Sequence, residues 1–221
     1  MLILSLMVPF ILWALMHFLF PFIAGLITNH WSVDIYPYYK QAGTFFLMLI
    51  PMMMGMVYGF ILLDERDGGI ITAISVTPTG KSGYLKLRMG IPLFLSFIFI
   101  VLFQLLLRLT GTMNISQLLV ISLLISSQSL ILLMILGAFA HNKVMGLAIS
   151  KGFGILLIGP LFDYALPHPF NWCGAYSPLF WASRSLLAGS HVTFWLYAGT
   201  TFLFHLLLIW ILFRKFNARS D

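Results

Sequence analysis

The fold class is decided by one uncharged stretch of the chain, GTFFLMLIPMMMGMVYGFILL at residues 43–63. A helix needs about 20 mainly apolar residues to cross the hydrocarbon core of a bilayer. A strand of a membrane barrel would be about half as long and would alternate in polarity. Because the stretch is long and apolar throughout, it predicts a transmembrane helix, whose backbone satisfies its own hydrogen bonds in lipid.

Apolar runs of similar length recur along the chain, which has 221 residues, 61% of them hydrophobic and only 8% charged. A soluble domain is about 25% charged, so we expect an all-α integral membrane protein. The runs predict six spans, at about residues 4–28, 43–63, 89–110, 118–140, 146–164 and 193–213. They leave no room for a soluble catalytic domain, and residues 1–221 are expected to form one transmembrane domain.

The basic residues predict the orientation of the chain, because cytoplasmic loops carry an excess of Lys and Arg. An even number of spans puts both termini on one side. Nine basic residues lie on that side and three on the other. We therefore expect both termini in the cytoplasm and the chain in the cell membrane of a bacterium. The net charge of +6 follows from this asymmetry and needs no nucleic acid as partner.

Two connections are longer than a turn. The inner one, residues 64–88, opens with three acidic residues, as expected at a helix start, and continues with Ile70, Ile71 and Ile74 on one face of a short helix that Pro78 should end. Such an amphipathic helix lies on the membrane or docks into a groove on another protein.

The outer connection, residues 165–192, is rich in aromatic side chains, which favour the headgroup level of a bilayer. Its prolines divide it into short pieces. Ser177 fits a helix cap, Pro178 a first helical position, and Gly189 a helix stop. We expect an interfacial or re-entrant hairpin before the last span.

The inner loop carries Glu65-Arg66-x-x-Gly69, then Pro78, then Tyr84-Leu85-x-x-Arg88, and the outer hairpin carries Ser177-Pro178-Leu179 followed by Arg184. The order of these motifs resembles that in the permease subunits of type-2 ABC transporters. The resemblance covers nearly the whole chain. The family often has Thr at the position of Ile70, and it usually has a basic amphipathic helix before the first span, which is missing or lies before the start of this sequence.

The resemblance implies an exporter half that pairs with a second permease chain, identical or different, and binds a separate ABC ATPase, which holds ATP and Mg²⁺. It implies an ATPase-coupling role for six residues of the inner loop: Glu65, Arg66, Gly69, Ile70, Ile74 and Pro78. Pro178 and Arg184 would belong to an outer gate.

No cofactor or metal is expected in this chain. Gly80-Lys81-Ser82 resembles the end of a phosphate-binding loop, but the glycine that the full motif needs five residues earlier is Ser75. The single cysteine, Cys173, excludes an intrachain disulfide and a cysteine metal cluster. Four methionines at 52–54 and 56 point around a helix and cannot all face one ion.

Polar residues inside the spans are functional hypotheses by default. Gln104, Ser126 and Gln128 either line a translocation path or serve helix packing. Arg108, four residues after Gln104, is expected on the same face and within reach of the outer membrane surface. Asp163 could pair with Arg184 or another base.

His17 and His205 are isolated in sequence, and we expect them to be hydrogen-bonded packing residues rather than ligands. Gly55 and Gly59, spaced as Gly-x-x-x-Gly, predict a face where another helix approaches closely.

Three other functions stay open at this stage: an intramembrane enzyme, a channel, and a permease-like immunity factor. The enzyme is disfavoured because nearly all acids fall in loops and neither Gly-x-Ser-x-Gly nor His-Glu-x-x-His occurs. The substrate is also open, since an apolar wall suits drugs, antibiotics, peptides or lipids.

Overall fold

The computed structural model describes residues 2–75, 80–109 and 113–220, and every element among them is helical. Six helical segments of this described part are long and apolar enough to cross a membrane. They are Leu6–Trp31, Tyr36–Asp67, Gly83–Leu106, Ile115–Phe139, Lys143–Ala165 and His191–Phe216. Their positions match the six stretches predicted from the sequence and are consistent with a six-span membrane protein.

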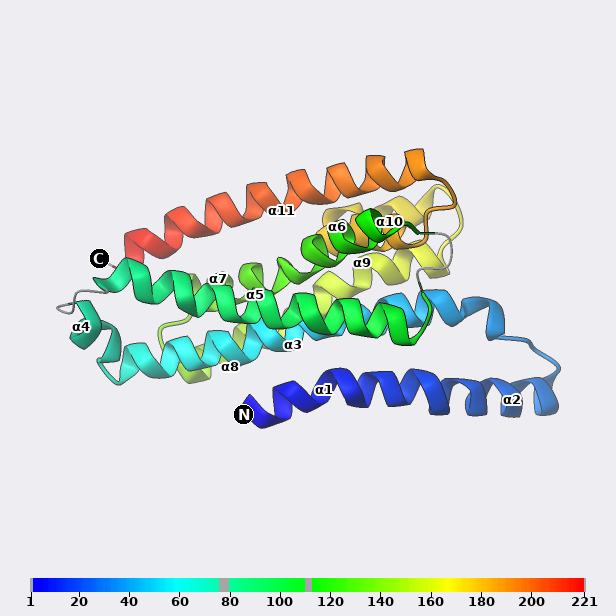
Figure 1. The fold of residues 1–221 in the computed structure, drawn as a ribbon, viewed down its shortest axis with the longest axis horizontal. Coiled ribbons are helices and arrows are strands. Elements are labelled where there is room, and N and C mark those ends of the chain that lie inside the picture. Colours follow the sequence, from blue (N-terminus) through cyan, green and yellow to red (C-terminus); the bar gives the residue numbers. More distant parts are fainter. Residues whose placement is uncertain (1, 76–79, 110–112, 221) are drawn as a thin grey trace.

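The helices run along one common long axis (Figure 1). Spans one to three are formed by α1 (Leu2–Ala14) with the π-helix η1 (Leu15–Leu19) and α2 (Phe20–Trp31), by η2 (Tyr36–Tyr38) with α3 (Tyr39–Asp67), and by α5 (Gly80–Leu106). Span four is α6 (Ile115–Ser126) with α7 (Gln128–Phe139), span five is α8 (Lys143–Lys151) with α9 (Gly154–Ala165), and span six is α11 (His191–Ser220).

Three short helices lie at the two ends of the bundle. The connection between α3 and α5 contains α4 (Ile70–Ser75), and the connection between α9 and α11 contains η3 (Phe170–Tyr176) and α10 (Pro178–Leu186). Figure 1 places α4 and the C-terminus at the left end of the molecule, which we call the α4 end. The opposite end is called the η3 end.

Helix α3 packs closely against α7, as the two spaced glycines predict. A Cβ atom on Gly55 would lie 2.6 Å from the backbone oxygen of Ser129, and one on Gly59 would lie 2.6 Å from Cδ1 of Leu136. Only glycine permits this separation of the two helices. Spans two and four are accordingly the most buried, with 67% of their apolar windows inside the bundle, against 17% for span one.

The inner connection is shorter than predicted. Asp64, Glu65 and Asp67 belong to the last turn of α3 and not to the start of a following helix, because no proline or glycine lies between Leu63 and Gly68. Gly69 has φ +72°, a left-handed conformation that glycine adopts without strain and that separates α3 from α4. Acids at a helix C-terminus face the negative end of the helix dipole, so they need basic partners.

The predicted shared face of Gln104 and Arg108 is wrong. Helix α5 ends at Leu106, and Arg108 follows it in a left-handed conformation with φ +52°. Two backbone bonds, from Leu109 N to Gln104 O at 3.1 Å and from Arg108 N to Leu105 O at 3.2 Å, close this terminus in a Schellman pattern. Gln104 is fully buried, whereas Arg108 is exposed at the η3 end.

Three spans contain an interruption. Span one has the π-helix η1, span four has a turn at Ser127, and span five has a turn at Gly152 and Phe153. In span four the hydroxyls of Ser126 and Ser127 donate to carbonyls three residues earlier, at 2.8 and 2.6 Å. Such bonds compete with the backbone ladder and bend helices.

Candidate functional site

The last turn of α3 forms the centre of a charged cluster at the α4 end. Glu65 accepts hydrogen bonds from Tyr84 Oη and from Arg88 Nε, the latter at 2.8 Å, and Arg88 Nη2 also pairs with its carboxylate. Both charged side chains are largely buried, with exposed fractions of 15% for Glu65 and 21% for Arg88. Glu65 therefore fixes the end of α3 to the first turns of α5.

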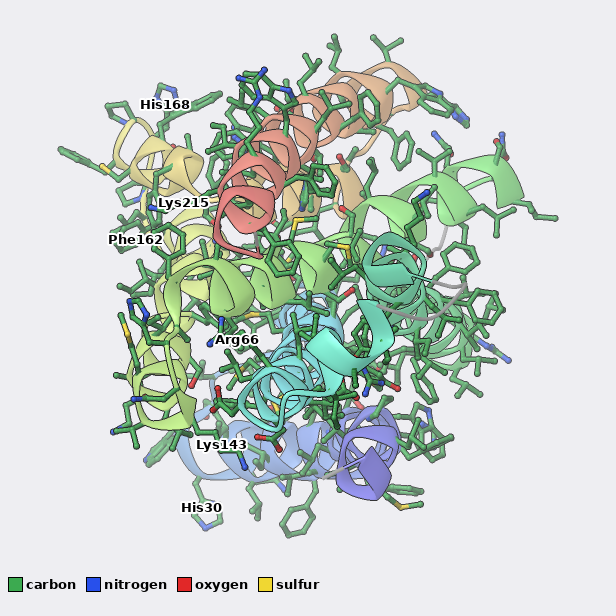
Figure 2. All side chains as sticks on the ribbon, turned by 90° about the vertical axis from the view of Figure 1, so that its left-hand side faces the viewer. His30, Arg66, Lys143, Phe162, His168 and Lys215 are labelled. Atoms are coloured by element: carbon green, nitrogen blue, oxygen red, sulfur yellow. The ribbon has the colours of Figure 1, made fainter. Side chains whose placement is uncertain are left out.

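The neighbouring residues contact two other helices. Arg66 donates to the carbonyl oxygens of Gly137 at 3.3 Å and Ala140 at 2.7 Å, at the C-terminal end of α7, where a positive charge is favourable. Asp64 Oδ1 lies 2.7 Å from Lys143 Nζ at the start of α8. Figure 2 shows this end face on, with Arg66 directed toward α7 and Lys143 at the rim beside α8.

The contacts of the cluster differ in strength. Asp64 and Lys143 are 45% and 60% exposed, and an exposed pair contributes only about 0–1 kcal/mol. The pair of Glu65 and Arg88 is mostly shielded from water, and removing one partner would leave the other charge desolvated. Together the three consecutive residues join α3 to α5 and α7 by shielded contacts and to α8 by an exposed ion pair.

Helix α4 extends from the cluster with one side covered and one free. Ile71 is half-buried against the hydrophobic cluster that contains Tyr58 and Leu62. Ile74 is also half-buried, whereas Ile70 is 45% exposed. Pro78, the expected end of this helix, lies outside the described residues. Among the described residues, Gly69 and Ile70 thus form the exposed side of α4, which we call its free side.

A second ion pair lies at the η3 end and confirms the predicted pairing of Asp163 with Arg184. Arg184 Nη2 lies 2.7 Å from Asp163 Oδ1, and its Nε lies 3.2 Å from Oδ2, a two-pronged contact. The guanidinium also lies over the rings of Trp172 and Phe180, 4.3 and 4.4 Å from their centroids. Both charged side chains are only 12–13% exposed.

The pair anchors α10, which begins as the sequence predicts. Ser177 caps the helix by accepting from Leu179 N at 3.2 Å, and Pro178 occupies its first position. Most of α10 is buried against α9, α11 and α6. At the end of η3 the Tyr176 hydroxyl donates to the Ile155 carbonyl at 2.6 Å, and desolvation raises the pKa of this phenol, which keeps it a donor.

The three residues considered for a translocation path lie inside the bundle of this one chain, each with an exposed fraction of 0%. Gln104 Nε2 donates to Ser122 Oγ at 2.9 Å, and Gln128 Oε1 lies 3.2 Å from His205 Nε2. His205 Nδ1 also lies 2.8 Å from the Thr201 carbonyl. His205 is therefore the hydrogen-bonded packing residue that we expect.

His17 differs from that expectation. It is exposed within η1, where its ring stacks on Trp13 with 5.2 Å between the ring centroids. Within the described part of the chain its ring makes no side-chain hydrogen bond. The π-helix causes this, because its wider turn rotates His17 away from the buried face that Met16 occupies.

Several partners were not assigned from the sequence. Arg88 and Tyr84 were recognised as a motif, yet their common target, Glu65, emerges only when α3 and α5 lie side by side. Because Tyr84 and Arg88 are four residues apart, they lie on one face of a helix. This spacing was the sequence feature that could have indicated a shared partner. Lys143 and Trp172 gave no such signal.

The six long apolar helices indicate a multi-pass membrane protein. Most ion pairs of its described residues connect one helix to another. Comparison with known proteins identifies its class as an export permease. The chain belongs to the family described as fluoroquinolones export permease protein Rv2686c-like, whose model matches residues 1–213.

Two relatives come from Mycobacterium tuberculosis, the fluoroquinolones export permease proteins MT2760 of strain CDC 1551 / Oshkosh and Rv2686c of strain ATCC 25618 / H37Rv. Each is 27% identical over 202 residues, which cover 90% of this chain and 80% of the relative. No solved structure matches the chain significantly. The family points to a transporter rather than an enzyme and to a bacterial cell membrane.

Proposed function

We propose that this chain is the membrane-spanning subunit of an ATP-driven exporter of fluoroquinolone-type drugs. The family membership and the names of the mycobacterial relatives support the drug class. The resemblance to type-2 ABC permeases supports the energy source. In this proposal a second permease chain completes the path, and a separate ATPase subunit binds ATP and Mg²⁺ on the cytoplasmic side, where the α4 end lies.

The charged cluster carries the coupling part of the proposal. An ATPase that contacts the free side of α4, around Gly69 and Ile70, can exert force on the bilayer helices only if α4 is firmly connected to them. Glu65 and Arg66 provide that connection, because they join the adjoining end of α3 to α5 and α7. Closure of the ATPase dimer would then shift the population between inward-facing and outward-facing states by moving these helices together.

At the η3 end, Pro178 and Arg184 would belong to the gate through which the drug leaves. The contact of Arg184 with Asp163 fastens α10 to α9. Opening would therefore move α9 and α10 as one piece relative to α6 and α11. In this proposal α9 and α10 keep their contact with each other, and the gate opens where they pack against α6 and α11.

The coupling role is tested by reconstituting the chain with its ATPase and measuring drug transported per ATP hydrolysed. Glu65→Ala should lower this ratio about tenfold, because the end of α3 loses its contact with α5 and Arg88 is left unpaired. The amount of the variant in the membrane should stay close to that of the parent, since insertion depends on the apolar spans.

Two further variants separate coupling from general damage. Asp64→Ala removes only the exposed pair with Lys143 and should leave the ratio unchanged within about twofold. The exchange Glu65→Arg with Arg88→Glu should recover a large part of the loss. Normal transport per ATP by a well-inserted Glu65→Ala chain would refute the coupling role.

A further inference from the structure

Lys151 carries a charge at a depth where a bilayer is apolar. It is the last residue of α8 and lies eight positions beyond Lys143, about 12 Å along the helix. Gly146, between them, already lies against Leu63 and Phe60 of α3, with a Cβ position 2.8 Å from Leu63 Cδ1. Lys151 is therefore well inside the span Lys143–Ala165.

The side chain points away from the bundle. Gly146, Ser150 and Phe153 form the buried face of span five. The opposite face is a row of exposed residues that are apolar except for this lysine: Val144, Leu147, Lys151, Ile155, Ile158 and Leu161. Lys151 thus stands on a surface that, by its other residues, would face lipid.

No carboxylate of the described residues neutralises Lys151. The acidic side chains near ion-pair distance of a base are engaged elsewhere: Asp64 with Lys143, Glu65 with Arg88, Asp67 beside Arg66, and Asp163 with Arg184. Asp34, at the other end of the molecule, accepts from the Tyr36 amide. Among the carboxylates that the structure describes, none is left to pair with this ammonium.

A break in the helix coincides with the charge. Gly152 and Phe153 form a turn directly after Lys151, with their amides bonded to the carbonyls of Ile149 and Ser150 at 2.9 and 3.1 Å. Gly152 is exposed, like Lys151. Irregular backbone at membrane depth occurs where protein covers it or where it lines a water-filled cavity. Extension of a lysine toward the headgroups would explain the charge but not the exposed break.

We infer that the exposed face of span five around Lys151 lines a water-filled path, and that the Lys151 ammonium binds the carboxylate of the transported compound. This rests on the proposed function, because fluoroquinolones are planar aromatic compounds that carry a carboxylate. A phosphate of an anionic lipid offers similar chemistry, and the experiment below separates the two sources.

Access of water is measured by thiol labelling in the full complex with the ATPase. The only native cysteine, Cys173, is first replaced by serine. Cysteine introduced by Lys151→Cys should react with a charged, membrane-impermeant methanethiosulfonate at least about tenfold faster than cysteine introduced by Leu207→Cys. Leu207 is the matched control, because it is 52% exposed on α11 and lies nine positions before Phe216, at a comparable depth.

Ligand identity is then tested in two lipid backgrounds. The first background is vesicles of phosphatidylcholine alone. There a carboxylate-bearing quinolone should slow the modification of Lys151 in the parent chain by an amine-reactive probe. It should slow the labelling of the Lys151→Cys chain less, because cysteine lacks the ammonium. Adding phosphatidylglycerol should not reproduce this protection. Protection by the anionic lipid in place of the quinolone would overturn the assignment to a transported carboxylate.

Transport supplies the last readout. Lys151→Gln should reduce export of the quinolone acid about tenfold or more while sparing its methyl ester, and Lys151→Arg should restore export of the acid. Equal effects on acid and ester, or labelling at position 151 as slow as at position 207, would refute the inference. If the parent complex exports no quinolone, the proposed function fails, while the labelling result still decides whether the face is wet.

Discussion

Arg184 shows how one residue can serve a helix end, an ion pair and an aromatic cluster together. Its guanidinium binds Asp163 with two nitrogens and lies over two aromatic rings at once. A planar, delocalised cation can do both, whereas the ammonium of lysine is a compact point charge. The sequence indicated the pairing with Asp163, because few charges occur near that span end. It gave no indication of Trp172, which approaches only through the fold of η3.

We predict that Arg184→Gln destabilises the protein by about 3 kcal/mol, because Asp163 is left charged and shielded from water. This should lower the midpoint of thermal unfolding in detergent by roughly 5–10 °C. Combining it with Asp163→Asn should recover part of the loss, since no unpaired charge then stays behind. Lys40→Gln, at an exposed lysine of the same end, is the control. An unchanged midpoint for Arg184→Gln would show that the ion pair does not anchor α10.

Arg108 and His17 mark the limit of residue-level prediction. Helical spacing relates two side chains only while the helix continues regularly. Helix α5 stops before Arg108, and η1 changes the phase of the helix at His17. The local signals are indirect: Pro21 has no amide N–H to bond the carbonyl of His17 four residues earlier, and Gly111 follows Arg108 by three residues.

At the scale of elements, the contact of α3 with α7 is the best-predicted feature of the packing. The two glycines at a spacing of four indicated a closely approaching helix, and α7 fills that role. The identity of the neighbour could not be deduced, because the spans are apolar on all sides and hydrophobic periodicity then selects no face.

Gly55→Ala should therefore destabilise the bundle by about 1–3 kcal/mol, because its Cβ would meet the backbone oxygen of Ser129, which cannot move aside without separating α3 from α7. Thermal unfolding in detergent measures the effect. Gly199→Ala is the matched control, since Gly199 lies within α11 with nothing within 4 Å of its Cβ position. Alanine there should be neutral or slightly stabilising. Equal shifts for both variants would disprove the close-contact explanation.

The interruptions of the spans are elements that hydropathy does not resolve. A window of apolar residues predicts that a segment crosses the bilayer but not whether its helix is continuous. In span four the hydroxyls of Ser126 and Ser127 bond to carbonyls three residues earlier, and these bonds account for the turn at Ser127. In span five the signal in the sequence is Lys151 next to Gly152, a charge and a glycine within an apolar stretch.

At the scale of the whole molecule, the number and positions of the spans follow from composition and length, whereas the connections between them do not. The contacts of Glu65 and Arg66 join residues that are 23 and 74 positions apart. Such pairs depend on which helices become neighbours. The acids of the inner loop were expected at a helix start, but they lie at the end of α3. The contacts between neighbouring helices explain how basic partners stabilise them there.

The charges of the chain predict the orientation of the whole bundle. The α4 end and the termini share the side that carries eight of the twelve basic residues, Lys151 lies within span five, and the other side carries Lys40, Arg108 and Arg184. Because positive loops stay in the cytoplasm, a fluorescent protein fused after Asp221 should fluoresce in whole cells. Alkaline phosphatase, which folds only outside the cytoplasm, should be active when inserted after Gly189, between α10 and α11.

The opposite fusions are the controls: phosphatase after Asp221 should be inactive, and the fluorescent protein after Gly189 should be dark. Reversal of all four results would put α4 outside the cell, where no ATPase could reach it, and would refute the coupling proposal together with the orientation. Agreement would place Glu65, Arg66 and the free side of α4 in the compartment that holds ATP. The charge asymmetry of the sequence would then determine which end of the bundle can receive energy and which end can release the drug.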